Sequence, residues 1–311
     1  MTREAFLARL GGGGLPKFVS RMSTHSRIPG AHRTLTPTGG LEMERTAPFR
    51  FAVDDPKDYD WVLSARLGKP MRKVRIEEKE LLTICLVDMR PSLLFGAVRT
   101  KREFAIEVAA TLGLAAIAAG DRALIAGLAP NTLLPNLVGT RRTELLITQA
   151  LELWEAQGVT ETFDLAQAIH HVAHSAPRYT SIFLLSDWIL PLDTTRPRET
   201  LASQRPYQET AEALKMLALD REIGMVTITD IREREIPKGI WRLRTEPHGK
   251  TVVLNGGIGR RAQRIREKLL AEQHEWFIML NALGADVCEF ATTEDFSYLE
   301  RLMQFFVARQ S

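Results

Sequence analysis

The residues best suited to chemistry lie within LVDMRPSLLFG, residues 86–96. An apolar run ends there in Asp88, and Arg90 and Ser92 follow at intervals of two residues. Carboxylate and hydroxyl oxygens are ligands for Mg²⁺ or Mn²⁺. The guanidinium of Arg90 instead brings a fixed positive charge and no acceptor lone pair, so it can pair with an aspartate in place of a metal ion. The stretch therefore predicts either a divalent-metal site or an arginine–aspartate pair.

A second aspartate, Asp187, ends the apolar run YTSIFLLSD. If the two runs are strands of one sheet, Asp88 and Asp187 converge at its edge. The hydroxyls of Ser92 and of Thr140 or Thr143 would then add oxygen ligands. The candidate metal set is accordingly Asp88, Ser92, Thr140 and Asp187, with Mg²⁺ or Mn²⁺ as the ion.

The apolar pattern of the chain predicts the elements that would position these residues. Short, continuously apolar runs predict strands buried on both faces, and amphipathic runs with capping signals predict helices between them. One such signal is the capping-box pattern of Thr100 and Glu103. The expected strands cover 81–88, 122–128, 179–187, 223–230 and 286–291. The expected helices cover 100–120, 140 or 143 to 158, 164–175, 207–220, 258–282 and 294–309, and a hairpin joins 241–244 to 251–254.

This alternation predicts an α/β fold with a doubly wound, mainly parallel, Rossmann-like sheet and an N-terminal extension. Ligands of such folds bind at the carboxyl ends of the strands, near the point where the strand order reverses. Asp88, Asp187 and Asp230 each end a predicted strand. We therefore expect at least two of them to meet at that edge.

Composition divides the chain into three predicted parts. Residues 1–45 are rich in Gly, Pro, Thr, Ser and Arg, which predicts a short helix followed by irregular, partly ordered chain. Residues 46–80 form a segment that we expect to pack on the sheet domain, and residues 81–311 form that domain.

Acidic residues gather within DDPKDYD, residues 54–60. Four carboxylates in seven residues can suggest calcium, but the spacing is not that of an EF-hand loop. The alternative is an ordered turn in which Trp61 is buried and Asp60 pairs with Arg66. We favour the turn.

The N-terminal part is basic, because residues 1–50 contain eight Lys or Arg and three Asp or Glu in a chain of net charge +3. Such an arm can touch nucleic acid or an acidic partner, or it can wrap an acidic domain of its own chain. Aromatic residues are sparse among these basic residues, which argues against nucleic-acid binding.

The sequence predicts a cytoplasmic protein with no membrane segment. The most apolar stretch, residues 108–119, is broken by Gly120 and falls short of the roughly 18–20 residues that cross a bilayer. The charged N-terminus does not have the apolar core of a signal peptide. The two cysteines lie in apolar runs and indicate buried, reduced thiols.

Several motifs together resemble a known family. They are VDDPKDYDWVLSARLGKP, RIPGAHRTLTPTGGLEME, LLSDW, IWRLRTEPHGKT and TTEDFSYLERLMQFFVARQ. Over roughly residues 25–311 the chain resembles the bacterial domain of unknown function fifty-eight family. The block that carries the resemblance best supplies a structural signature, formed by Asp54, Asp55, Asp60, Trp61 and Arg66.

The resemblance implies a fold similar to von Willebrand factor A domains. It also implies a pairing with MoxR-type AAA+ ATPases and an adaptor role in protein maturation or complex remodelling. Carried over by position, the metal-ion-dependent adhesion site of those domains falls on Asp88, Ser92, Thr140 or Thr143, and Asp187. Arg90 takes the place of its first serine, so the resemblance implies a degenerate site.

We therefore expect a non-enzymatic adaptor that binds a MoxR-type ATPase or its client protein. Its docking surface would comprise Asp88, Arg90, Ser92 and Asp187, with no catalytic residue and no cofactor, or a Mg²⁺ or Mn²⁺ ion. One alternative is a Mg²⁺-dependent phosphoryl-transfer or hydrolytic enzyme that uses Asp88 and Asp187. A second is nucleic-acid binding through the basic arm.

Overall fold

The fold was analysed in a computed structural model of the whole chain. It describes residues 29–33, 42–51, 54–76, 78–79, 81–129, 139–156, 163–190, 203–234, 240–244, 251–255, 271, 274, 276–283, 285–294 and 297–308. The chain divides into two compact units, one of residues 1–22 with 82–311 and one of residues 23–81. Each unit is described by itself.

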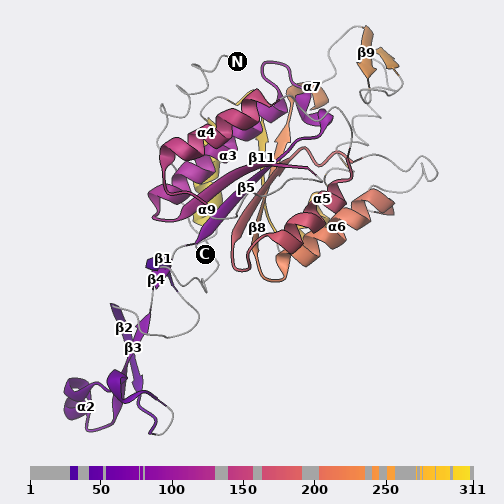
Figure 1. Cartoon of the computed structure of the whole chain (residues 1–311). Helices are drawn as coiled ribbons and strands as arrows, with labels where there is room; N and C mark the ends of the chain where they lie inside the picture. The colour runs from indigo at the N-terminus through magenta and orange to yellow at the C-terminus, as the bar shows by residue number, and fades with distance from the viewer. Residues whose placement is uncertain are drawn as a thin grey trace. The chain divides into compact units, whose positions relative to one another are not determined.

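The larger unit is built on a five-stranded sheet (Figure 1). Its strands are β5 (Leu82–Asp88), β6 (Arg122–Leu128), β7 (Ser181–Ser186), β8 (Glu222–Thr229) and β11 (Asp286–Ala291). Their spatial order is β11-β8-β7-β5-β6, and every neighbouring pair is parallel. The predicted α/β fold with a parallel, doubly wound sheet is confirmed.

Helices cover both faces of this sheet (Figure 1). One face carries α3 (Lys101–Ala118), α4 (Thr143–Glu155) and α9 (Ser297–Ala308); the other carries α5 (Leu165–Ser175) and α6 (Arg205–Ala218). Because successive strand residues point to opposite faces, the inner strands must be apolar throughout. Residues 82–88 of β5 are buried without exception, as the uninterrupted apolar run predicts.

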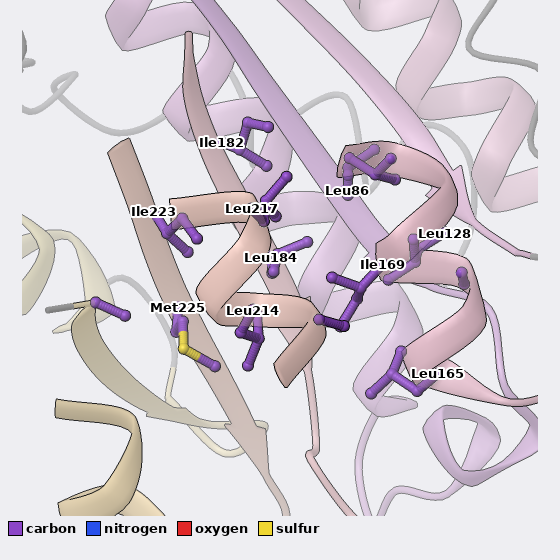
Figure 2. Close-up of a cluster of buried hydrophobic side chains, with 14 of the residues drawn as sticks. Leu86, Leu128, Leu165, Ile169, Ile182, Leu184, Leu214, Leu217, Ile223 and Met225 are labelled. Carbon is purple, nitrogen blue, oxygen red and sulfur yellow. The ribbon is translucent and has the colours of Figure 1, made fainter. Parts of the chain in front are cut away.

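The buried cluster between the sheet and α5 and α6 shows this alternation (Figure 2). Ile182 and Leu184 of β7 point toward the helices and meet Ile169 and Leu214. The intervening Phe183 lies on the opposite face, where its ring centroid is 6.3 Å from that of Phe306 in α9. Each strand therefore contributes to two cores, which ties the two helical layers to one sheet.

The order of the strands places a switch point between β5 and β7. From β5 the chain passes to β6 on one side and then returns to β7 on the other side. The two crossovers leave in opposite directions, and ligands of such folds bind at this point, outside the carboxyl ends of the strands. Asp88 and Asp187 lie at this point, as the ends of the two apolar runs predict.

The remaining parts of the larger unit agree with the sequence where they are described. β9 (Ile240–Arg244) and β10 (Thr251–Asn255) pair as the predicted antiparallel hairpin. A four-residue helix, α7 (Ile231–Arg234), follows β8. The predicted helix over 258–282 lies mostly outside the described residues, although Trp276 and Leu280 near its end join the core.

The smaller unit contains two antiparallel strand pairs, β1 (Pro29–Arg33) with β4 (Glu78–Lys79) and β2 (Glu42–Pro48) with β3 (Met71–Ile76). A 3₁₀ turn η1 (Pro56–Asp58) and the helix α2 (Trp61–Leu67) complete it. β1 and the start of β2 fall in residues 1–45, where we expected irregular, partly ordered chain. These two strands are ordered by pairing with the distant β4 and β3, although the local composition is rich in Gly, Pro and Thr.

The rest of the basic arm, including its predicted short helix, lies outside the described residues. The packing of residues 46–80 on the sheet domain stays a prediction.

None of the helices in the described ranges is both long and apolar enough to cross a membrane. The longest of them, α3, starts with Lys101, Arg102 and Glu103.

The helix α3 starts after Thr100, whose side chain caps it. Thr100 accepts a hydrogen bond from the Glu103 backbone N–H, and the Glu103 carboxylate accepts one from Thr100, so the predicted capping box is present. Thr100→Ala should lower the free energy of unfolding by about 1 kcal/mol, because it leaves a helical N–H without its acceptor. The matched control is Thr148→Ala in the exposed middle of α4, where the hydroxyl binds only the Glu144 carbonyl. Chemical denaturation that gives equal effects for both variants would contradict a capping role.

Candidate functional site

The two strand-end aspartates predicted to converge do so. Asp88 ends β5, Asp187 directly follows β7, and the two strands pair side by side. Asp88 is fully buried and Asp187 is 4% exposed. Two carboxylates at such positions would repel one another strongly without neutralising partners.

Arg90 supplies the first neutralising charge. Its Nη2 lies 2.6 Å from Asp88 Oδ2 and 3.5 Å from Asp187 Oδ1, and its Nε lies 2.9 Å from Asp88 Oδ2. Nη2 also lies 3.2 Å from Ser186 Oγ, and Nη1 donates to the Ile189 carbonyl at 2.7 Å. The predicted arginine–aspartate pair is therefore present, with the guanidinium spanning both strands.

A strained backbone at Trp188 brings the β7 side of the site to Arg90. Trp188 has φ +54°, a left-handed conformation that is rare for a bulky residue. The turn lets Asp187 Oδ1 accept from the Ile189 N–H at 3.1 Å and sets the Ile189 carbonyl toward Arg90. Trp188 itself is buried in the core on the α5 and α6 face, and this packing holds the strain in place.

Lys101 supplies a second buried cation, which sequence reasoning missed. It is the first residue of α3, and its side chain is 1% exposed. Its Nζ lies 2.7 Å from Asp187 Oδ2 and 2.6 Å from Glu233 Oε1 of α7. The only sequence signal was its place after Thr100, the predicted helix cap at the switch-point edge.

The pKa values of the two acidic groups on Lys101, Asp187 and Glu233, shift in opposite directions. Burial raises the pKa of Asp187, but the charges of Lys101 and Arg90 outweigh burial, and the pKa lies below its ordinary value. Burial lowers the pKa of Lys101, which the Asp187 and Glu233 carboxylates more than reverse. For Glu233, burial raises the pKa more than Lys101 lowers it, so the pKa ends above its ordinary value. Asp187 is thus firmly held in its charged form, and Glu233 is not.

The third strand-end aspartate, Asp230, connects several loops by hydrogen bonds. It is fully buried and accepts hydrogen bonds from the Ala97 N–H, the Arg232 N–H and the Thr292 hydroxyl. Arg99 connects the same segments, because its guanidinium donates hydrogen bonds to Glu107 and to the carbonyls of Thr292 and Glu294. The loop from β5 to α3 is thereby fixed to the ends of β8 and β11.

The residues at the edge do not fit a divalent cation as they are arranged. Asp88 and Asp187 already accept from Arg90 and Lys101. An ion bound to both carboxylates would lie beside two fixed positive charges. The Ser92 hydroxyl is buried and makes no hydrogen bond to another described residue, so it stands outside the network. The residues assigned to a docking surface by sequence thus form a charge network without Ser92.

The predicted metal ligand Thr140 lies at the wrong edge of the sheet. Its backbone pairs with Ala123 near the start of β6, with N–O distances of 2.7 and 2.9 Å. Asp88 is in register with Leu128, five residues further along β6 and therefore roughly 16 Å away. Thr143 starts α4 just beyond Thr140. We placed these threonines at the carboxyl edge by position alone, but α4 starts at the amino edge.

The signature residues of the smaller unit form an ordered turn. Asp54 lies 3.0 Å from Arg72 and accepts from the Arg50 N–H, which lowers its pKa. Asp55 caps η1, and Asp60 caps α2 by accepting from the Leu63 N–H at 3.0 Å. The expected turn is present, although Asp60 acts as a helix cap.

The expected burial of Trp61 is wrong, because Trp61 is 76% exposed. It is the first residue of α2, and its ring is tilted by 57° to that of Tyr59, at a centroid distance of 4.5 Å. Arg66 is also exposed, in the last turn of α2.

Exposed apolar residues surround the charge network. They come from the β5–α3 loop, the turn after Asp187 and the start of α7, and we call them the strand-end rim: Leu94, Phe95, Val98, Ile189 and Ile231. Val98 is 82% exposed. Because β8, β7 and β5 are adjacent, the rim follows three neighbouring strand ends. Exposed apolar side chains that gather in one region are typical of a protein-binding surface.

Arg90→Met should lower the free energy of unfolding by about 3–5 kcal/mol, because it leaves the Asp88 carboxylate buried without its partner. Arg205→Met is the matched control. Arg205 Nε lies 2.7 Å from Glu209, but its side chain is 80% exposed, and such pairs contribute about 0–1 kcal/mol. Equal losses for the two variants in urea denaturation would contradict a stabilising role for the buried pair.

The lowered pKa of Asp187 predicts a pH dependence. The folded state holds this carboxylate charged at a pH where the unfolded state begins to bind a proton, so the contribution is complete above about pH 4. It is lost as the pH falls through the lowered, folded-state value. The difference in unfolding free energy between the wild type and Asp187→Asn should therefore shrink below about pH 4. A difference that stays constant from pH 7 to pH 3 would be inconsistent with this shift.

Comparisons with known proteins agree on a family. The profile of the family described as Protein of unknown function DUF58 matches residues 48–275. Uncharacterized protein Rv1480 of Mycobacterium tuberculosis (strain ATCC 25618 / H37Rv) and Uncharacterized protein Mb1516 of Mycobacterium bovis are each 28% identical over 219 residues. The aligned part covers 69% of this chain and 67% of each relative. The match covers part of the smaller unit, the switch point and helices on both faces of the sheet, and the chain therefore belongs to the DUF58 family.

Proposed function

We propose that this protein is a non-enzymatic adaptor, acting in the cytoplasm, that binds a protein partner through the carboxyl edge of its sheet. The partner proposed is a MoxR-type AAA+ ATPase or its client, in protein maturation or complex remodelling. The observation that supports a binding role most directly is the strand-end rim around the network of Asp88, Arg90, Asp187 and Lys101. The ATPase as partner follows from the family resemblance.

The geometry favours binding over catalysis. A catalytic acid, base or nucleophile needs a reactive group within reach of a substrate. Asp88 and Asp187 are instead buried and already accept hydrogen bonds from Arg90, Ser186 and Lys101. For the same reason, an enzyme that uses both aspartates to hold Mg²⁺ has less support. Calorimetric titration with Mg²⁺ and Mn²⁺ tests that alternative, which requires saturable binding.

A rim variant tests the proposed surface without disturbing the buried network. Val98→Asp places a charge on the rim and should weaken binding to the MoxR-type ATPase of the same organism by at least about tenfold. Leu219→Asp is the control, because Leu219 is 83% exposed and lies between α6 and the start of β8, at the amino edge. Biolayer interferometry with the full chain measures both.

Three results would contradict the proposal. The first is no binding by the wild type, which removes this ATPase as a partner. The second is equal binding by Val98→Asp and the wild type, which removes the rim as the surface. The third is an equal loss in both variants, which points to a general effect of added charge.

A further inference from the structure

Arg90 is not the cation that a partner would meet. All three of its nitrogens donate to groups of its own fold, namely Asp88, Ser186, Asp187 and the Ile189 carbonyl. Its side chain is 5% exposed. A partner carboxylate would have to break several of these bonds, and it would leave Asp88 without compensation.

Lys101 is different, because its ammonium group has more N–H donors than hydrogen bonds to described residues. It has three N–H donors, and among the described residues it bonds only to Asp187 and Glu233. The Phe95 ring lies beside it, with the centroid 5.9 Å from Nζ. Phe95 belongs to the strand-end rim, so this ammonium group lies near one residue of the proposed binding surface.

Glu233 is the group that covers Lys101 on the outer side. The Glu233 side chain is 21% exposed, whereas those of Lys101 and Asp187 are each 1% exposed. It belongs to the single-turn helix α7, which lies outside the sheet and carries the rim residue Ile231. Of the two carboxylates on Lys101, only Glu233 can leave without opening the core.

The pKa values of the two carboxylates on Lys101 shift in opposite directions. Burial raises the pKa of Glu233 more than Lys101 lowers it, whereas the pKa of Asp187 lies below its ordinary value. The second oxygen of Glu233 accepts from the Asp230 N–H at 3.0 Å, which is a local bond within the same turn. Exchange of one carboxylate for another at Lys101 also leaves the net charge of the network unchanged.

We propose that Glu233 is an internal stand-in for a carboxylate on the partner protein, which displaces Glu233 and binds Lys101 during docking. The ligand class is an aspartate or glutamate flanked by apolar side chains, because Phe95 lies beside Lys101 and the exposed Ile231 belongs to the same helix as Glu233. This inference rests on the proposed docking function. It makes Glu233 an autoinhibitory contact and Lys101 the cation that selects the partner.

Glu233→Gln tests the exchange in the complex. The amide keeps the size of the side chain and removes the competing charge, so affinity for the MoxR-type ATPase should rise. If the wild type is open about one tenth of the time, the gain is about tenfold. Glu209→Gln is the matched control, since Glu209 pairs with Arg205 on exposed α6 and should leave affinity unchanged.

A second measurement needs no ATPase. Full-length protein with ¹⁵N-labelled lysine side chains is titrated with acetate, and with acetamide as the uncharged analogue. The Lys101 ammonium signal, assigned from its loss in Lys101→Met, should shift with acetate in Glu233→Gln. It should shift less in the wild type and not at all with acetamide.

The outcomes separate this inference from the proposed function. If the ATPase binds the wild type and Glu233→Gln equally, the exchange is wrong and the docking function stands. If the ATPase binds neither, the docking partner is wrong, and the acetate titration decides the exchange. Without a shift of the Lys101 signal in Glu233→Gln, Lys101 is not a carboxylate site.

Discussion

The structure depends on neutralising two aspartates that the sheet forces together. Parallel pairing of β5 and β7 brings Asp88 and Asp187 to one buried edge, where an uncompensated carboxylate would cost several kcal/mol. The β5–α3 segment supplies both compensating charges, Arg90 and Lys101. This requirement fixes the path of the loop and the point at which α3 begins. The strained turn at Trp188 meets the same need from the β7 side, because it presents the Ile189 carbonyl to Arg90.

Much of this architecture could be predicted from the sequence, because its signals are local. Continuous apolar runs mark strands buried on both faces, and a Thr–x–x–Glu box marks the start of α3. Since parallel strands share one carboxyl edge, the convergence of Asp88 and Asp187 followed from the two runs alone. Arg90 could be paired with them, because a guanidinium two residues after an aspartate can neutralise its charge.

The features that failed depend on distant parts of the chain. Thr140 was placed at the site by spacing, yet its backbone pairs with Ala123 at the opposite edge. Lys101 was not assigned to the site, because only the approach of α7 and β7 shows that it is buried. Trp61 was expected to be buried in the acidic turn, but α2 presents it outward. For Thr140 and Lys101 the decisive contact is with residues far away in sequence.

Arg90 belongs to the same chain as the aspartates whose charge it neutralises. A tethered partner has a high effective concentration at its site and does not diffuse away. An exchangeable ion would equilibrate with the solvent, so its occupancy would vary with supply. Every folded copy of this chain instead contains the compensating charge in a fixed ratio. The charge compensation of Asp88 is therefore established when the chain folds.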